Sequence, residues 1–204
     1  MVVDAQRWDR QYAEHDPPTF EDPSAQVAEE VLHLPPGRAL DLAGGRGRHA
    51  IPLAERGWDV TAVDFSQQAL RQGGELAAQR GVTVQWVHAD LESWDPPASA
   101  FELVLIAYLQ VDTAVLAAVL SRAAGAVAPG GRLVAVGYGQ DASGPTQAGP
   151  SEPARRYDLA VATAAVGPLV VERAELVERT IERAEGSRVA VEAVVRAVRP
   201  AVTP

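Results

Sequence analysis

The stretch RALDLAGGRGRHAIPLAERGWDVTAVD, residues 38–64, decides the fold of this chain of 204 residues. Its first apolar run, Ala39–Leu42, predicts a buried strand, which the glycine-rich turn of residues 43–47 ends. Residues 48–56 predict a helix that Gly57 terminates. A second apolar strand follows and ends on an acid. The stretch therefore predicts a strand–turn–helix–strand unit of the nucleotide-binding type.

The acid that ends this stretch, Asp64, is expected at the carboxyl end of the second strand. There it can accept hydrogen bonds from ribose hydroxyls. The glycines of the turn let the backbone approach a ligand closely, and the N-terminus of the following helix offers unpaired N–H groups.

The turn alone does not choose between ligands. Residues 45–50, GRGRHA, satisfy G-x-G-x-x-A, which also suits NAD or FAD. Asp41 lies beside the turn, where its carboxylate would repel a pyrophosphate and attract the ammonium group of an amino-acid-like ligand. S-adenosylmethionine (SAM) carries such an ammonium group. The turn therefore favours SAM and leaves a dinucleotide open.

Composition excludes several kinds of chemistry. The net charge is −9 without a basic tract, which disfavours nucleic acid as a partner. All 18 basic residues are arginine, so a P-loop lysine and a Schiff-base lysine are absent. Without cysteine there is no disulfide, thiolate nucleophile or Cys-ligated zinc, and the four histidines are scattered without the spacing of metal ligands. We expect no metal.

The length suits a single domain spanning residues 1–204. No apolar run approaches the ~20 residues of a membrane helix. The N-terminus is charged and lacks the apolar region of a signal peptide. A cytoplasmic protein without a membrane partner is expected, and its oligomeric state is left open.

Beyond residue 64, strand and helix patterns alternate. The expected elements are a helix over 67–80, strands over 82–87 and 101–109, a helix from 112 or 113 to about 127, a strand over 132–137 and a helix over 157–166. Two β-rich runs, 169–182 and 187–198, predict an antiparallel pair at the sheet edge. The fold class is therefore α/β: a Rossmann-like, doubly wound, mostly parallel seven-stranded sheet with an antiparallel C-terminal hairpin.

Two segments flank this core. Residues 1–34 are expected to form an N-terminal helical lid, whose first helix places Trp8 and Tyr12 on one face at i, i+4 spacing. That helix either closes over a ligand or simply docks on the sheet. Ser24 is expected to cap a second helix over 25–34. Residues 139–155, rich in Gly, Pro and Ser, predict a mobile loop.

Over nearly its whole length the chain resembles the class I SAM-dependent methyltransferases. The segments that carry the resemblance are ALDLAGGRGRHA, VTAVDFS, VHADLESW, FELVLIAYLQ and PGGRLVAVG, in that order. Each is weak alone, and together they are specific. Within the class, the N-terminal Trp8-Asp9-Arg10-Gln11-Tyr12 is most similar to the tellurite-resistance and thiopurine S-methyltransferase-like group.

The resemblance implies a set of cofactor-binding residues. These are Asp41, Ala43, Gly44, Gly45 and Gly47 at the methionine end of SAM, Asp64 at the ribose, Phe65, Asp90 and Leu91 at the adenine, and Ala107 facing the methyl group. The substrate-binding candidates are Trp8, Tyr12, Tyr108 and Tyr138. Tyr108 is the candidate catalytic residue, although with a reference pKa ≈ 10 it suits positioning better than proton abstraction.

The implied activity is methyl transfer from SAM to a small-molecule S-, Se/Te- or O-acceptor, with S-adenosylhomocysteine (SAH) as product. Alignment and desolvation can supply most of the acceleration of such an in-line displacement. Two alternatives stay open: an NAD(P)-dependent oxidoreductase and a non-catalytic SAM-binding protein. The second rests on a bulky Arg46, expected to narrow the mouth of the site, and on the helix-weakening pair Gly73-Gly74.

Overall fold

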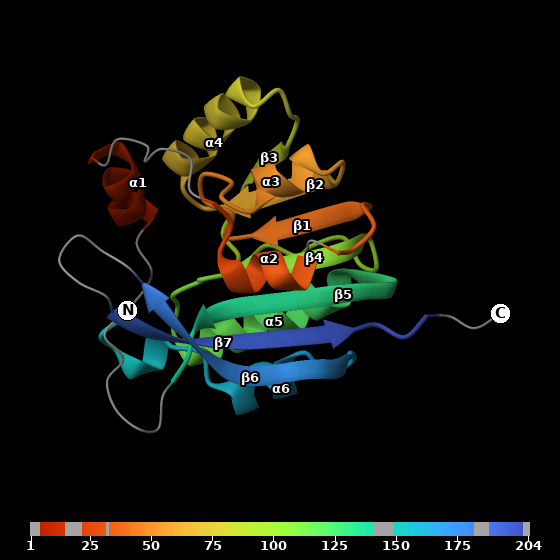
Figure 1. Cartoon of the computed structure of the whole chain (residues 1–204). Helices are drawn as coiled ribbons and strands as arrows, with labels where there is room; N and C mark the ends of the chain where they lie inside the picture. The colour runs from red at the N-terminus through yellow and green to blue at the C-terminus, as the bar shows by residue number, and fades with distance from the viewer. Residues whose placement is uncertain (1–4, 15–21, 32, 141–148, 182–187, 202–204) are drawn as a thin grey trace.

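A computed structural model describes residues 5–14, 22–31, 33–140, 149–181 and 188–201. Its centre is one seven-stranded sheet with the order β3-β2-β1-β4-β5-β7-β6, in which β7 runs antiparallel to both neighbours (Figure 1). The strands are β1 (Arg38–Leu42), β2 (Asp59–Asp64), β3 (Gln85–His88), β4 (Phe101–Ala107), β5 (Val127–Tyr138), β6 (Val170–Ile181) and β7 (Arg188–Val198). This arrangement confirms the predicted fold class.

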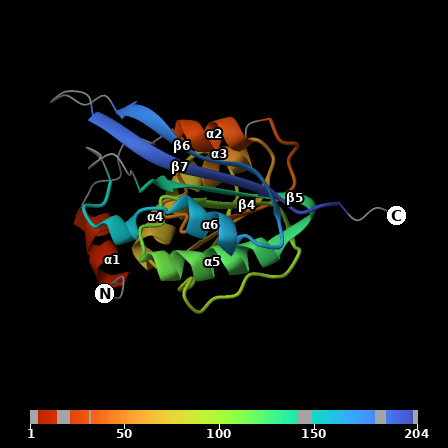
Figure 2. The ribbon, with the colours of Figure 1, turned by 90° about the horizontal axis from the view of Figure 1, so that it is seen from below.

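Helices cover both faces of the sheet (Figure 2). They are α1 (Ala5–Glu14), α2 (Ala25–Val31), α3 (Ala50–Glu55), α4 (Gln67–Gln79), α5 (Thr113–Ala126) and α6 (Leu159–Ala165), with a 3-10 turn over Pro153–Arg155. Helices α2 and α3 pack on one face and α5 and α6 on the other. Among the described residues no helix has the length and apolarity to cross a membrane.

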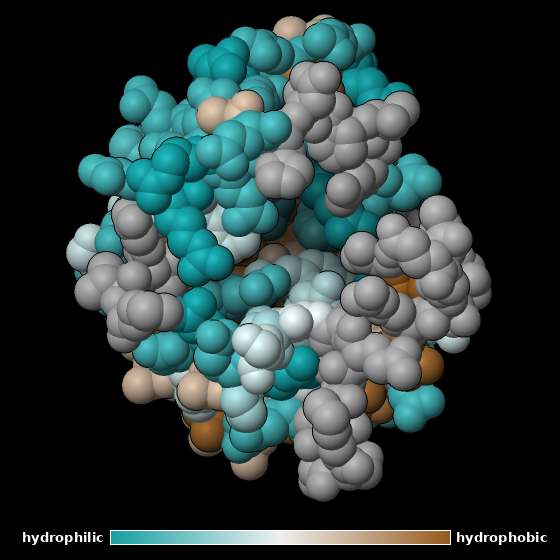
Figure 3. Space-filling view, turned by 90° about the vertical axis from the view of Figure 1, so that its left-hand side faces the viewer, coloured by the Kyte–Doolittle hydropathy of each residue, from teal (hydrophilic) through white to brown (hydrophobic). Residues whose placement is uncertain are grey.

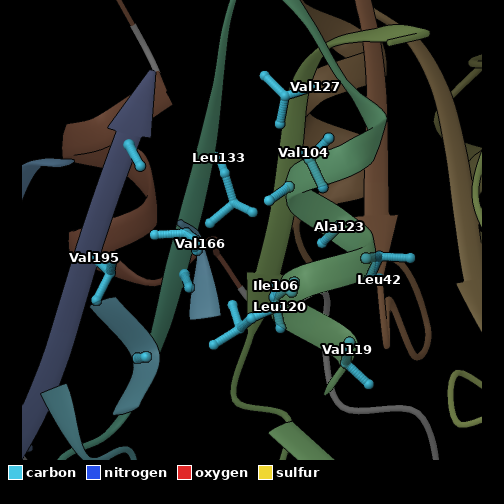
Figure 4. Close-up of a cluster of buried hydrophobic side chains, with 14 of the residues drawn as sticks. Leu42, Val104, Ile106, Val119, Leu120, Ala123, Val127, Leu133, Val166 and Val195 are labelled. Carbon is cyan, nitrogen blue, oxygen red and sulfur yellow. The ribbon is translucent and has the colours of Figure 1, made fainter. Parts of the chain in front are cut away.

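Two buried apolar clusters, one on each face, hold the layers together. Beneath α5, the strand residues Leu42, Val104, Ile106 and Leu133 meet Leu120 and its helical neighbours (Figure 4). The strands carry branched apolar side chains on both faces, as expected for a parallel sheet with helices on both faces. Their burial makes the sheet a rigid base for the residues that follow each strand.

The structure corrects several predicted boundaries. The second helix ends at Val31 rather than at residue 34, and α3 begins at Ala50 rather than at 48. The strand expected over 82–87 is β3, Gln85–His88, and the one over 101–109 ends at Ala107. The predicted caps are confirmed, because Ser24 Oγ accepts from the Val27 N–H and Ser66 Oγ from the Ala69 N–H.

The largest correction concerns Pro129-Gly130-Gly131, which was expected to be a break before a strand over 132–137. Instead β5 begins at Val127, and this tripeptide lies in the strand where the register with β4 shifts. A Cβ on Gly131 would lie 3.0 Å from the carbonyl oxygens of Phe101 and Glu102. The glycine is therefore used for a close approach of two strands rather than for a turn.

The predicted mobile loop over 139–155 is only partly described, since residues 141–148 lie outside the described part. Its start is held in place, because the Gly139 N–H donates to Val191 O and the Gln140 N–H to Tyr157 O. A Cβ on Gly137 would lie 2.3 Å from the buried ring of Tyr157. This close contact joins the end of β5 to the segment that leads into α6.

Candidate functional site

The carboxyl ends of the parallel strands meet at one edge of the sheet, beside α1. Leu42 pairs with Val63 of β2 and Ile106 of β4, so the residues that follow these strands lie side by side. This edge faces the viewer in Figure 3, where a hollow opens near the centre of the surface. Edges of this kind are the usual ligand sites of open α/β sheets.

Two adjoining cavities form the site, and they share Trp8, Tyr12, Ala43, Tyr108 and Gln110 as lining residues. We call the smaller one, about 100 Å³, the carboxylate cavity, because its charged lining residues are Asp64, Asp90 and Glu92. We call the larger one, about 420 Å³, the arginine cavity, because its charged lining residues are Arg46, Arg48 and Arg179.

The glycine turn after β1 has the backbone that a closely approaching ligand needs. Ala43, Gly45 and Gly47 have φ of 58°, 55° and 82°, in the left-handed region that favours glycine. A Cβ on Gly45 would lie 2.8 Å from Tyr12 Oη. Gly44 and Gly45 line the arginine cavity and Ala43 lines both, so these predicted residues do border the site.

Asp41 lies under this turn and is 1% exposed. Neither of its carboxylate oxygens accepts a regular hydrogen bond from the described residues, and Gly44 covers it so closely that a Cβ there would lie 3.2 Å from Oδ2. Burial and the nearby Asp64 raise the pKa of Asp41 to about 7, while the Ala50 N–H works in the opposite direction. A buried carboxyl without a partner is costly unless a donor or cation meets it.

Asp64 has a different environment. Its Oδ2 accepts from the Gly45 N–H at 2.9 Å and its Oδ1 from the Ser66 N–H at 2.8 Å. Burial raises the pKa of Asp64, and these donors oppose the rise. The side chain thus braces the glycine turn, a role the sequence did not predict, while it also borders the carboxylate cavity.

The predicted adenine residues Phe65, Asp90 and Leu91 all line the carboxylate cavity. Ala107 lines the arginine cavity together with Tyr138. Gly47 lines neither, and a Cβ there would lie 2.6 Å from the Trp86 ring. The structure thus brings the predicted cofactor residues together at the sheet edge, with Asp41 beneath the turn and Gly47 packed behind it.

Trp86 also explains the glycine pair of α4. A Cβ on Gly73 would lie 2.6 Å from the Trp86 ring and 3.1 Å from the Arg46 carbonyl carbon. The glycine therefore lets α4 pack against the glycine turn. Of the glycine pair that the sequence suggests is a weak point, Gly73 is the residue that allows this close approach, whereas a Cβ on Gly74 would lie 3.8 Å from Trp86.

Arg46 ties α1 to the turn. Its Nε donates to Gln72 Oε1 at 2.6 Å, its Nη2 donates to the Tyr12 carbonyl at 3.0 Å, and its guanidinium lies 5.0 Å from the Tyr12 ring centroid. Gln72 Nε2 donates to the same carbonyl. Asp9 Oδ1 accepts from Ser66 Oγ at 2.6 Å. Arg46 lines the arginine cavity, and its side chain also clamps the first helix.

Tyr108 has an unusual backbone, with φ of 56°, and its side chain belongs to a buried network. Its hydroxyl donates to Glu192 Oε1 at 2.8 Å. Arg179 donates to the same oxygen from Nε at 3.0 Å and Nη2 at 2.7 Å. Burial and the Glu192 charge raise the pKa of Tyr108 to about 12. A phenol that donates to a carboxylate and has this pKa is a poor general base at neutral pH.

Arg179 and Glu192 were not among the residues predicted for the site. Glu192 is fully buried, and it is the one acid in the apolar run RVAVEAVVRAV of β7. That isolated acid could have indicated a buried ion pair in the sequence, because a charge in a buried strand needs a partner. Tyr138 lies at the end of β5 with its ring centroid 5.4 Å from that of Tyr108.

No cluster of metal-ligating side chains occurs in the described ranges. Burial lowers the pKa of His49 to about 3, so the ring is neutral where it borders the arginine cavity. A ring nitrogen of His88 lies 3.0 Å from the Phe65 carbonyl oxygen. His15 lies outside the described residues.

Comparison with known proteins agrees with this geometry. Residues 39–131 match the family described as "Methyltransferase domain". A demethylmenaquinone methyltransferase of Thermus thermophilus is 36% identical over 110 residues, which are 53% of this chain and 50% of that protein. The chain spans at most half the length of the curated relatives it matches.

Two solved structures extend the likeness to nearly the whole fold. The structure described as "Conversion of a Disulfide Bond into a Thioacetal Group during Echinomycin Biosynthesis" has a TM-score of 0.73 at 19% identity, covering 98% of this chain and 93% of its own. Magnesium protoporphyrin IX methyltransferase of Synechocystis, solved with bound SAM, has a TM-score of 0.59 at 20% identity, covering 96% and 79%. At these identities the likeness concerns the fold. It does not distinguish the predicted tellurite-resistance or thiopurine subgroup.

Proposed function

We propose that this chain, whose residues 39–131 match the family described as "Methyltransferase domain", is an enzyme that transfers a methyl group from SAM to a small-molecule S-, Se/Te- or O-acceptor. The domain match and the shared fold favour this activity over an NAD(P)-dependent oxidoreductase. Membership of the tellurite-resistance and thiopurine S-methyltransferase-like group remains part of the proposal.

The observation that supports the proposal is the buried carboxyl of Asp41 beneath the glycine turn, whose oxygens accept no hydrogen bond from the described residues. A pyrophosphate placed on this turn would meet a second negative charge at close range, which is unfavourable in a buried site. The ammonium group of the methionine part of SAM would instead supply the missing positive charge and hydrogen-bond donors. The residues present therefore fit SAM.

The other predicted residues would hold the rest of the cofactor. Asp64 has lone pairs left beside its two backbone donors and borders the cavity, so it can accept from ribose hydroxyls. Asp90 and the Leu91 N–H are assigned to the adenine edge, with Phe65 packed on the ring. The carboxylate cavity holds all four side chains.

SAM supplies an electrophilic methyl group on a sulfonium leaving group. What the protein adds is alignment of the acceptor and exclusion of water. We assign positioning to Tyr108, because its hydroxyl already donates to Glu192 and its pKa is about 12. A thiol or hydrochalcogenide acceptor, which ionises near neutral pH, needs no base from the protein.

We assign α1 the role of a lid. Trp8 and Tyr12 line both cavities, and their ring centroids lie 6.0 Å apart. The helix is fixed by polar contacts from Arg46, Gln72 and Ser66 rather than by burial in the apolar clusters. Such contacts exchange with water at a small net cost, so the helix can release and close again.

The proposal is tested by calorimetric titration of the full chain with SAH, with NAD as the control ligand. We expect micromolar binding of SAH and none of NAD. Binding of NAD instead would overturn the methyltransferase assignment. SAH binding without turnover of any thiol, chalcogenide or phenol acceptor would favour a non-catalytic SAM-binding protein.

A pair of variants locates the binding. Asp64→Ala should weaken SAH binding by roughly 1.5–3 kcal/mol, the scale of a hydrogen bond to a charged group. Asp59→Ala is the matched control, because Asp59 begins the same strand at the opposite edge and is exposed. Equal affinities of the two variants for SAH would remove Asp64 from the site.

A further inference from the structure

The two cavities differ in charge in a way that the proposed cofactor does not explain. The chain carries 27 acidic and 18 basic residues, so its average surface is acidic. The arginine cavity nevertheless has three arginines and no acid among its described lining residues. A cleft lined by one sign of charge attracts ligands of the opposite sign.

Arg179 is the arginine that lies farthest from the expected position of SAM. It belongs to β6, which is separated from β1 by β4, β5 and β7 in the sheet. Neighbouring strands are about 4.8 Å apart, so roughly 19 Å of sheet separate β6 from the glycine turn. The carboxylate of the methionine part, bound at that turn, would not reach Arg179. Its charge therefore serves the other end of the arginine cavity.

The ion pair with Glu192 uses only part of the hydrogen-bonding capacity of the Arg179 guanidinium. Nε and Nη2 donate to Glu192 Oε1, and among the described residues no hydrogen bond uses Nη1. The side chain is 27% exposed, whereas Glu192 is fully buried behind it. The pair thus holds the guanidinium plane in place and leaves an edge at the cavity. A fixed guanidinium edge is well suited to a carboxylate.

Aromatic rings complete this end of the cavity. Tyr108 and Tyr138 lie together, and Tyr138, the last residue of β5, is paired with Glu192 of β7. The hydrogen bonds to Glu192 and the charge of this carboxylate raise the pKa of Arg179, so the guanidinium beside these rings stays charged. A volume of about 420 Å³ is within the range of small-molecule sites and leaves room for a ring beside the methionine part of SAM.

We infer that the methyl acceptor is a small organic molecule with a carboxylate, which Arg179 binds while Tyr138 and Tyr108 pack against its apolar part. The inference rests on the proposed function and names the substrate class of the same site. An uncharged acceptor would leave the Arg179 edge without a partner, at a cost in affinity. Glu192 acts as a positioning residue, because it orients Arg179 and Tyr108 without lining the cavity.

The test compares benzoate with benzamide, which has nearly the same shape and no charge. Each is titrated calorimetrically into the full chain saturated with SAH. We expect benzoate to bind at least about tenfold more tightly than benzamide, the effect of one charge-assisted hydrogen bond. Equal binding of the two probes, or no binding of benzoate, would overturn the inference. If SAH itself does not bind, the proposed function is wrong, and the comparison of benzoate with benzamide does not apply.

Three variants assign the discrimination to Arg179. Arg179→Gln should reduce the benzoate preference to within about twofold, and Arg179→Lys should retain part of it. Arg71→Gln is the matched control, because Arg71 lies exposed on α4 in an ion pair with Glu75, and it should keep the full preference. A preference that survives in Arg179→Gln would place the anion site elsewhere.

Removal of Arg179 alone leaves Glu192 buried without its counter-ion, which can prevent folding. The double variant Arg179→Gln, Glu192→Gln replaces both charges by neutral groups of similar shape. It should fold, bind SAH and lack the preference for benzoate. If it folds, binds SAH and still prefers benzoate, the inference is wrong.

Discussion

The two cavities of the site are built in different ways. The carboxylate cavity and the turn beside it depend on three acids in one continuous stretch of the chain. Asp41 is the second-last residue of β1, Asp64 ends β2, and Asp90 follows β3. The arginine cavity depends on Tyr108, Arg179 and Glu192, and the bond between Tyr108 and Glu192 joins residues 84 positions apart. The first is a product of local sequence, whereas the second exists only when β5, β6 and β7 pair in the observed register.

The largest expected effect concerns the free energy of unfolding that is lost because Asp41 is buried. Its pKa is about 7 in the folded protein, above the ordinary value, so the folded state holds a proton that the unfolded state releases between about pH 4 and pH 7. The stability that this proton brings is present below pH 4 and is lost as the pH rises through 7. The loss is on the order of 4 kcal/mol as an upper bound.

The measurement is the difference in free energy of unfolding between Asp41→Asn and the parent protein in urea, without cofactor. The difference should grow in favour of the variant from pH 4 to pH 7 and then level off. The pH dependence of the parent protein alone does not isolate Asp41. The pKa of His49 is lowered to about 3, so His49 makes the folded protein less stable as the pH falls below 6.5. A pH-independent difference would show that Asp41 titrates normally.

The same variant should bind the cofactor product poorly. Asp41→Asn removes the charge that faces the expected ammonium group, and we expect SAH affinity to fall by about 2–3 kcal/mol. Asp59→Asn, an exposed acid at the far end of β2, serves as the control and should bind SAH normally. An Asp41→Asn protein that is more stable but binds SAH as well as the parent would contradict the ammonium assignment.

A neighbouring glycine pair tests the packing behind the turn. Gly73→Ala should destabilise the protein by about 1–3 kcal/mol, because the added methyl group overlaps the Trp86 ring. In Gly74→Ala the new Cβ would lie 3.8 Å from Trp86, and the better helix former should stabilise α4 by up to about 1 kcal/mol. Thermal unfolding of both variants gives the contrast, and equal shifts would show that α4 is not pressed against Trp86.

The smallest expected effect lies in the arginine cavity. Tyr108→Phe removes the hydrogen bond to Glu192 and keeps the ring, so the free energy of unfolding should fall by about 1 kcal/mol. If Tyr108 only positions the acceptor, the pH profile of turnover will keep its shape in the variant. The disappearance of a titrating group from that profile would make Tyr108 a catalytic base after all.

This contrast also explains what could be predicted from the sequence. The glycine turn, Asp64 and the alternation of strands and helices along the chain up to β5 follow from apolar runs and turn residues that lie close together in the chain. Arg179 could not be predicted, because β6 reads as an alternating charged strand and nothing in it indicates which arginine faces a cavity. The hydrogen bond from the Gly45 N–H to Asp64 could not be predicted for a related reason. The sequence pattern places a carboxylate at the end of a strand but does not show which N–H groups donate to it.

The outermost strand, β6, has a consequence for how this protein behaves in concentrated solution. It is twelve residues long, and among the described residues it pairs with β7 alone, so its other side presents backbone groups that could pair with a strand of another chain. Glu172, Glu175 and Glu178 are exposed along it, and they are interspersed with the arginines at 173 and 179. A second chain approaching this edge would have to desolvate these charges, which is the device natural sheets use against edge-to-edge aggregation. The strand that places Arg179 at the cavity therefore also hinders the pairing of this sheet edge with a strand of a second chain.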